Sequence, residues 1–301
     1  MSAAIETHRL SKRFGSTEAV RDLTFMVPEG SIFALLGPNG SGKTTTIKTL
    51  MNILEPSAGQ ARVLGTDSRR LGPREFARIG YISENQELPE WMTVRELVAY
   101  CRPMYPGWDD AFASQLQRQF DLPPDRALKR LSRGMKLKAA LLSSLAYRPR
   151  LLVLDEPFSG LDAVVREEFV RGILEMSERQ GWTLFVSSHD IDEVERLADH
   201  VGVVSEGRLQ MVQPLAALQA RVRRIEATVD PGFGRPASLP ASWMGFEVAG
   251  ARARFVETDY RTETSEALAR QVLGVSGVVS VEPLSLREIF LALAPTYRLP
   301  T

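Results

Sequence analysis

The 301-residue sequence lacks the features of several large protein classes. Its one cysteine, Cys101, cannot form a disulfide within the chain, which favours a reducing compartment. No apolar run approaches the roughly 18 residues of a membrane-spanning helix, and the charged start MSAAIETHRL does not resemble a signal peptide. Lysine plus arginine number 37, as do aspartate plus glutamate, so net charge indicates neither nucleic acid nor anionic lipid as a partner. If this protein acts at a membrane, we expect another chain to span it.

The sequence does contain enough apolar material for a buried core, with 44% hydrophobic and 25% charged residues. Short apolar runs at 31–36, 151–154 and 183–187 are typical of strands buried on both faces of a parallel sheet. Each run leads into an amphipathic helical stretch, and the first helix is predicted to continue through Leu54 and end before Pro56. This alternation predicts an α/β fold with a parallel sheet.

The strand pattern disappears between about residues 90 and 147. Thr93 and Glu96 are spaced as a capping box, and apolar side chains recur every fourth residue from 108 to 120. The sequence therefore predicts a helical insert within the α/β domain.

The pattern changes once more after residue 216. Three strands and one helix are predicted, at 224–229, 251–258, 277–281 and 263–273. A turn-rich segment, PGFGRPASLP, separates the first two strands. We therefore predict two domains, residues 1–216 and 217–301, the second being a small α+β accessory domain.

A glycine-rich loop before the first predicted helix matches the P-loop pattern G-x-x-x-x-G-K-[ST]. The matching residues are Gly37, Pro38, Asn39, Gly40, Ser41, Gly42, Lys43 and Thr44, and Thr45 follows. Glycines let successive backbone N–H groups point at phosphates. Lys43 offers a charge to the β and γ phosphates, and Thr44 offers a hydroxyl to Mg²⁺. The alternative is an ordinary glycine-rich turn between a strand and a helix.

Two acidic residues, Asp155 and Glu156, follow the apolar run at 151–154. Ligands bind at the carboxyl ends of strands in open α/β sheets, which is where these carboxylates would lie. Asp155 is the candidate to hold the metal ion or its water, and Glu156 to orient or deprotonate the water that attacks the γ-phosphate. A pair of solvated carboxylates at a strand end is the alternative.

Further segments, in order, resemble the ATP-binding subunit of an ABC transporter over about residues 5–212. Phe14 resembles the aromatic residue that stacks on adenine. The other segments are similar to the Q-loop (79–84), the signature motif (131–135), the D-loop (159–162) and the switch-histidine motif (187–189). The resemblance implies a P-loop NTPase core with an antiparallel N-terminal β-subdomain and a helical insert.

The resemblance also implies that two copies, or one copy and a paralogue, hold ATP between them. Ser132 and Gly134 of the signature motif would contact the nucleotide bound by the partner, and Asp162 would link the two sites. His189 would steady the γ-phosphate. Binding and hydrolysis of Mg-ATP would close and open this dimer and so drive a separate transmembrane permease.

The implied location is the cytoplasmic face of the cell membrane, through the permease, and no nucleic-acid partner is expected. The segment 84–105 is the candidate docking surface, with Trp91 and Met92 expected to be exposed. Packing of these two side chains inside the insert is the alternative.

Two departures from the family pattern bear on mechanism. The chain has Glu84 where the family commonly has the Q-loop glutamine, and Gln86 lies two residues further on. Both are therefore candidates to sense Mg²⁺ and to couple to the membrane partner. Glu84 joins Thr44 and Asp155 as a candidate metal ligand. The signature is LSRGM instead of LSGGQ. This variant and the ending at 286–293 resemble the subgroup that serves ABC-2-type permeases, often exporters.

Two other function classes stay open. One is an ABC ATPase that acts on ribosomes or DNA, although such proteins usually carry two cassettes, coiled-coil insertions or basic linkers. The other is a regulatory module whose accessory domain binds a ligand, for which residues 217–301 show no catalytic pattern.

Overall fold

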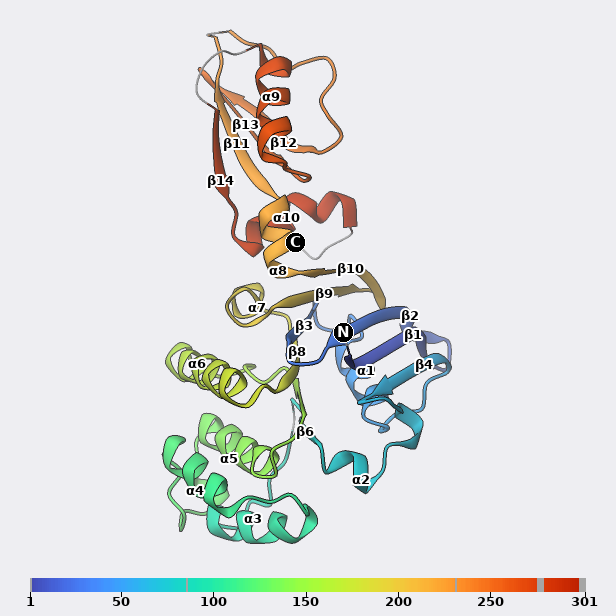
Figure 1. Ribbon diagram of the computed structural model, residues 1–301, viewed down its shortest axis with the longest axis vertical. Coiled ribbons are helices and arrows are strands. Elements are labelled where there is room, and N and C mark those ends of the chain that lie inside the picture. Colours follow the sequence, from blue (N-terminus) through green and yellow to red (C-terminus); the bar gives the residue numbers. More distant parts are fainter. Residues whose placement is uncertain (1, 85, 231, 275–278, 298–301) are drawn as a thin grey trace. The chain divides into compact units, whose positions relative to one another are not determined.

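The computed structural model describes residues 2–84, 86–230, 232–274 and 279–297 (Figure 1). The chain divides into two compact units, Met1–Leu209 and Gln210–Thr301. We describe each unit by itself. The domain limits predicted from the sequence, at 216 and 217, stay a prediction.

The centre of the first unit is a six-stranded sheet in the order β10-β9-β3-β8-β7-β6, whose edge strand β10 continues past Leu209 into the second unit. Its strands are β3 (Ile32–Leu36), β6 (Ile79–Ile82), β7 (Leu151–Asp155), β8 (Thr183–Ser188), β9 (His200–Ser205) and β10 (Arg208–Pro214). The pairs β6–β7, β7–β8, β8–β3 and β3–β9 are parallel. Every residue of β3, β7 and β8 is buried, which confirms the three predicted strands and explains why their sequences are continuously apolar.

A second, antiparallel sheet in the order β2-β1-β4-β5 confirms the predicted N-terminal β-subdomain. Its strands are β1 (Ala3–Phe14), β2 (Thr17–Pro28), β4 (Ala58–Val63) and β5 (Thr66–Asp67). Phe25 of β2 packs against Phe33 of β3 and Phe185 of β8, with ring centroids 5.5 and 5.9 Å apart. These aromatic contacts join the two sheets in one core.

Helices make up the rest of the first unit. They are α1 (Lys43–Leu50), α2 (Pro73–Phe76), α3 (Val94–Cys101), α4 (Asp110–Gln119), α5 (Arg133–Leu145), α6 (Ala163–Gln180) and α7 (Ile191–Leu197), with short 3₁₀ turns at Ser68–Arg70, Arg102–Met104 and Leu128–Arg130. None of the described residues from 86 to 150 belongs to a strand of the two sheets, which confirms the helical insert. The capping box of Thr93 and Glu96 is present at the start of α3.

Two expectations about this unit were wrong. The first helix ends at Leu50 and does not reach Leu54: Asn52 takes a left-handed conformation with φ of 56°, and the N–H groups of Ile53 and Leu54 both turn back to the carbonyl of Lys48. The second concerns Met92, which is 5% exposed and belongs to the core of the insert, as the alternative predicts; Trp91 is 75% exposed, as expected.

The second unit contains a four-stranded antiparallel sheet in the order β12-β13-β11-β14. Its elements are α8 (Leu215–Arg221), β11 (Arg223–Thr228), β12 (Trp243–Ala249), β13 (Arg252–Glu257), α9 (Thr262–Leu273), β14 (Val279–Pro283) and α10 (Leu286–Tyr297). The predicted strands at 224–229 and 251–258 and the predicted helix at 263–273 are confirmed, while 277 and 278 of the third strand lie outside the described residues. Trp243 stacks on Phe255 at 3.7 Å in the core of this unit.

Candidate functional site

The P-loop connects β3 to α1 and depends on its glycines. Gly40 and Gly42 have φ of 81° and 105°, values that residues with a Cβ rarely adopt. A Cβ on Gly37 would lie 2.2 Å from the carbonyl oxygen of Val204, and one on Gly42 would lie 2.5 Å from that of Ala19. The loop is thus held close to neighbouring backbone at both ends, in a shape that only this glycine pattern permits.

Lys43, the first residue of α1, turns its side chain back into the P-loop. Its Nζ donates hydrogen bonds to the carbonyl oxygens of Gly37 (2.7 Å) and Pro38 (3.1 Å) and lies 3.0 Å from Oε1 of Glu156. Both charged side chains are almost fully buried, at 5% and 6% exposure. A buried charge of this kind is stable only when it is paired.

Thr44 and Asp155 meet at the carboxyl end of β7. The Thr44 hydroxyl donates to Oδ1 of Asp155 at 3.1 Å, and the hydroxyl of Ser187 on β8 donates to the same atom at 2.6 Å. Burial raises the pKa of Asp155, and these two hydrogen bonds oppose that effect. Oδ2 of Asp155 is buried and has no hydrogen-bond partner. A free carboxylate oxygen beside a threonine hydroxyl is the kind of ligand set that a hard cation takes.

Glu156 lies between Lys43 and His189. Its Oε2 is 2.8 Å from Nδ1 of His189, and its backbone N–H donates to the hydroxyl of Ser187 at 2.9 Å. Its φ of 50° is a left-handed conformation, which turns the side chain away from the course of β7. The structure therefore brings together five of the predicted residues, which we call the P-loop cluster: Lys43, Thr44, Asp155, Glu156 and His189.

The helices that follow the signature motif and the D-loop, α5 and α6, approach each other closely. Ser132 caps α5 by accepting from the N–H of Met135, and Asp162 caps α6 by accepting from that of Val165. A Cβ on Gly134 would lie 2.7 Å from the side chain of Val165, so this glycine allows the close approach. We call Ser132, Gly134 and Asp162 the signature cluster. Among the described residues, no hydrogen bond or ion pair links Ser132 or Asp162 to the P-loop cluster.

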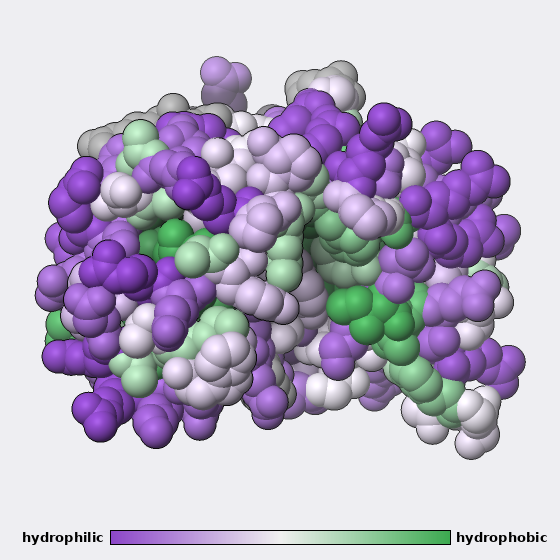
Figure 2. All heavy atoms as spheres, turned by 90° about the horizontal axis from the view of Figure 1, so that it is seen from below, coloured by the Kyte–Doolittle hydropathy of each residue, from purple (hydrophilic) through white to green (hydrophobic). Residues whose placement is uncertain are grey.

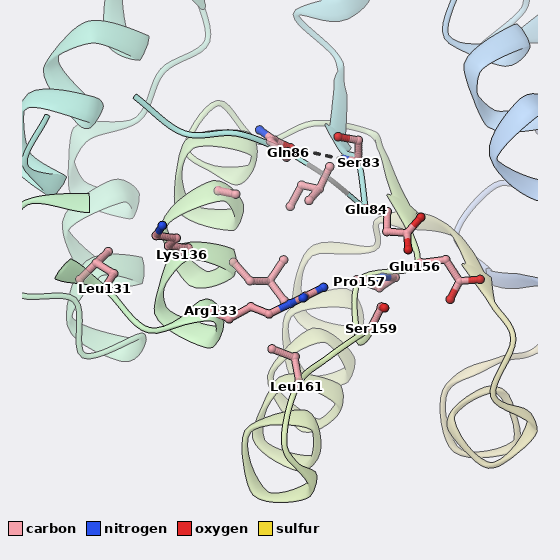
Figure 3. A pocket seen from close by; sticks show the side chains of 13 residues that line it. Ser83, Glu84, Gln86, Leu131, Arg133, Lys136, Glu156, Pro157, Ser159 and Leu161 are labelled. Atoms are coloured by element: carbon pink, nitrogen blue, oxygen red, sulfur yellow. Dashed lines mark hydrogen bonds between the residues drawn. The ribbon is translucent and has the colours of Figure 1, made fainter. Parts of the chain in front are cut away.

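A cavity of about 330 Å³ lies beside Glu156 and is lined by both Q-loop candidates (Figure 3). Glu84 is exposed, and Oε1 of Gln86 accepts a hydrogen bond from the N–H of Ser83 at 3.3 Å. The long side chain of Arg133 points into the same cavity, toward Ser159 (Figure 3). Among the described contacts, none joins Glu84 to Thr44 or Asp155, so its assignment to the metal stays a prediction.

Phe14 is the last residue of β1, and none of the described contacts joins it to either cluster. The ring is 47% exposed, and the ammonium group of Lys12 lies 5.1 Å from the ring centroid. Such an exposed aromatic ring is available for stacking, which keeps it as a candidate for the adenine.

Sequence reasoning missed the part that hydroxyl groups play in this site. Ser187 was singled out only as the start of the switch-histidine motif, yet its side chain bonds Asp155 and the backbone of Glu156. The available signal was a serine at the carboxyl end of a buried strand. Arg166 and Glu193, which contact the loop around His189, were missed as well, because no motif marks them.

Comparison with known proteins fits this geometry. Residues 20–159 match the family model described as ABC transporter. The bacitracin transport ATP-binding protein BcrA of Bacillus licheniformis is 33% identical over 226 residues, which are 74% of each chain. The chain belongs to the ATP-binding subunits of ABC transporters. This subunit is therefore an ATPase that binds nucleotide, and its cassette has the P-loop NTPase fold.

Other relatives differ in the transport that their names describe. The ABC transporter ATP-binding protein YtrB of Bacillus subtilis is 29% identical, over 75% of this subunit and 77% of YtrB. The sulfate/thiosulfate import ATP-binding protein CysA of Yersinia pestis is 35% identical, and the match spans 60% of CysA, less than two thirds of its length.

Solved structures agree on the fold of the cassette. A structure of an ATP-binding subunit of an ABC transporter matches with a TM-score of 0.65 and 27% identity, over 72% of this subunit and 92% of that chain. The ATP-binding cassette MJ0796, dimeric and bound to ADP and Pi, matches with a TM-score of 0.62 and 20% identity, over 70% and 98% of the two chains. In the part of this subunit that the structure describes, no helix has both the length and the apolar character needed to cross a bilayer.

Proposed function

We propose that two cassettes hold ATP between them, each offering its P-loop cluster to one nucleotide and its signature cluster to the other. The main support is that Ser132 and Asp162 make their side-chain hydrogen bonds inside their own helix caps, and that none of the described hydrogen bonds joins them to the P-loop cluster. A second subunit, either another copy or a paralogue, would complete each site. The dimeric state of MJ0796, a cassette of the same fold, agrees with this proposal.

Within that site, hydrolysis is in-line attack of water on the γ-phosphorus. Glu156 orients the water and accepts its proton, while the bond between the γ-phosphorus and the bridging oxygen of ADP breaks. Lys43 and the P-loop N–H groups stabilise the charge on the phosphate oxygens. His189, 2.8 Å from Glu156, holds that carboxylate and would steady the γ-phosphate.

We assign Mg²⁺ to the oxygen atoms of Thr44 and Asp155, with Glu84 as a third candidate. The buried, unpartnered Oδ2 of Asp155 fits such an ion, and Mg²⁺ keeps several of its waters and takes few protein ligands. When bound, the ion would neutralise charge on the phosphate oxygens. Ser187, through its 2.6 Å hydrogen bond, would fix the carboxylate that holds it.

A transmembrane permease is the proposed partner, at the cytoplasmic face of the cell membrane. A second cleft, of about 430 Å³, is lined by Phe76 of α2, by Leu97 and Tyr100 of α3 and by Ile53. Ile53 and Tyr100 are more than half exposed, at 54% and 52%. Figure 2, the view from below, shows hydrophobic side chains gathered beside a hollow. An exposed apolar cleft of this kind suits a short segment of the permease.

The direction of transport is proposed to be export. The support is the Arg133-Gly134-Met135 signature, which resembles that of the subgroup serving ABC-2-type permeases, together with the likeness to a bacitracin transport protein.

The sandwich is tested by the variant Glu156→Gln. Removing the base should abolish phosphate release while ATP still closes the dimer, so light scattering should show a dimer at saturating Mg-ATP. Glu175→Gln, an exposed carboxyl of α6, should hydrolyse ATP normally and serves as the control. A Glu156→Gln chain that releases phosphate at the wild-type rate, or stays monomeric with and without its paralogue, would refute the proposal.

A further inference from the structure

Arg166 of α6 contacts two loops that the nucleotide site uses. Its Nη2 donates to the carbonyl oxygen of Leu161 in the D-loop at 3.3 Å. Its Nη1 lies 3.3 Å from Oδ2 of Asp190, the residue after His189, and its Nε lies 3.2 Å from Oε1 of Glu193. One guanidinium group therefore holds the D-loop and the switch-histidine loop at a fixed separation.

Glu193 extends this connection to the residue that precedes His189. The carboxyl group is 8% exposed, and its Oε2 accepts a hydrogen bond from the Ser188 hydroxyl at 2.8 Å. That hydroxyl in turn accepts from the N–H of Asp190 at 3.0 Å. The residues on both sides of His189 are thus tied, directly or through Glu193, to Arg166.

This arrangement is more than packing between α6 and α7. An exposed ion pair, Arg196 with Glu167, already joins the same two helices away from the nucleotide site. Burying a further carboxylate costs free energy that surface ion pairs do not. The linkage through Arg166 differs from this surface pair because it reaches a D-loop carbonyl and the residues next to His189.

We propose that Arg166 is a positioning residue that couples the D-loop to the switch histidine, with Glu193 as its buried anchor. The inference rests on the proposed sandwich, in which Asp162 of the D-loop faces the partner. Displacement of the D-loop by a partner cassette would then move Arg166, and with it the loop that places His189 against Glu156. Hydrolysis in one site becomes dependent on closure of the interface.

The test uses the 301-residue chain with Arg166→Gln, which leaves a shorter, polar side chain and removes the charge. Because misplacing a catalytic group by about 1 Å costs up to about a hundredfold in rate, we expect kcat for ATP to fall roughly ten- to hundredfold, with KM little changed. The double variant Arg166→Gln/Glu193→Gln should be no slower than the single one, since both changes break one linkage. Losses that multiply, or a kcat equal to wild type, would overturn the proposal.

The matched control is Arg196→Gln, which removes the other ion pair between α6 and α7. It should leave kcat unchanged; an equal loss in both variants would mean a general packing effect and overturn the proposal. If Arg166→Gln does not fold, Arg166→Lys retains the charge without the three-way fork. A wild-type kcat in the lysine variant would likewise contradict the coupling.

A spectroscopic readout separates this inference from the proposed function. The chain has three histidines, so the imidazole signals in an NMR spectrum are few. Arg166→Gln should shift the ring signals of His189 and leave those of His8 in place, even without turnover. If wild type hydrolyses ATP and Glu156→Gln does not, but His189 is unmoved in Arg166→Gln, the coupling alone is wrong. If Glu156→Gln hydrolyses ATP at the wild-type rate, the proposed function fails instead.

Discussion

Several charged side chains of this subunit are buried, although water would solvate them better. Lys43, Asp155, Glu156 and Glu193 are all less than a tenth exposed, although each carries a charge in water. Their stability depends on short polar contacts, among which the hydroxyl of Ser187 is shared by two of them. Burial of paired groups strengthens their effect on a bound charge, which suits a site that handles triphosphate.

Replacing Lys43 by alanine should weaken ATP binding roughly ten- to hundredfold, because a hydrogen bond to a charged group contributes about 1.5–3 kcal/mol. A fluorescence titration with a nucleotide analogue measures this. Lys48→Ala, in the last turn of the same helix, should bind as wild type does. Equal affinity in the Lys43 variant would remove that residue from the site.

Replacing Glu193 by glutamine should change how stability depends on pH. Burial raises the pKa of Glu193 from 4.5 to about 7, so the folded chain holds this proton more tightly than the unfolded chain does. The stabilisation is complete below pH 4.5 and is lost as pH rises to about 7, at up to about 1.4 kcal/mol per pH unit. The Glu193→Gln variant has no carboxyl group to deprotonate at this position, so it does not lose this stability as the pH rises.

Chemical denaturation at several pH values tests this difference. Relative to wild type, Glu193→Gln should gain stability between pH 5 and 7 and then level off. If the free energies of unfolding of the two proteins change in parallel across that pH range, the Glu193 carboxyl is not the source of the pH dependence.

At the scale of helices and strands, continuous apolar runs predicted the buried strands and the spacing of Thr93 and Glu96 predicted the start of α3. What failed depended on tertiary contacts or on single conformations. Strand β12 was not predicted, because it follows a turn-rich segment and contains Gly245 with φ of 60°. The end of α1 was misplaced because a left-handed Asn52 carries no strong sequence signal.

The candidate site likewise contains residues that the sequence predicted and residues that it could not predict. Motif residues predicted the P-loop cluster, because phosphate chemistry restricts which residue types can stand at those positions. Arg166 and Glu193 could not be predicted, since their contacts join α6 to α7 across the fold and follow no fixed spacing. Met92 was misjudged because its burial depends on the helices that surround it.

The capping box of α3 offers a test at this scale. Thr93→Ala removes a hydroxyl that accepts from the N–H of Glu96 at 3.2 Å and donates to its carboxylate at 3.0 Å. Loss of such a cap should destabilise the first unit by about 1 kcal/mol. The midpoint of denaturant unfolding measures it, and the comparison is Thr262→Ala at the start of α9, an exposed residue whose side chain makes none of the described hydrogen bonds. Equal midpoints for Thr93→Ala and wild type would contradict the assigned cap.

For the whole molecule, the proposed docking cleft and the P-loop cluster are different places in the first unit, so transport and hydrolysis should be separable by mutation. Ile53 lines the cleft and is 54% exposed, so Ile53→Glu puts a charge there without disturbing a core. We expect loss of transport by the assembled complex, with ATP hydrolysis by the isolated subunit retained.

A transport assay in membrane vesicles and co-purification of the permease measure this effect. Met26→Glu is the control, because Met26 is a similarly exposed residue of β2, at 48%, and does not line the cleft. Undiminished transport by the Ile53 variant would exclude the cleft as the docking site.

The ion pair of Lys43 with Glu156 has a consequence for substrate binding. The cation proposed to receive phosphate lies 3.0 Å from the carboxylate proposed to activate water, so the two charges neutralise each other. An anion that binds Lys43 would have to compete with Glu156, and a triphosphate that pairs with the lysine would release the carboxylate. Binding of the substrate would thus release Glu156, the group proposed to activate the water that cleaves it.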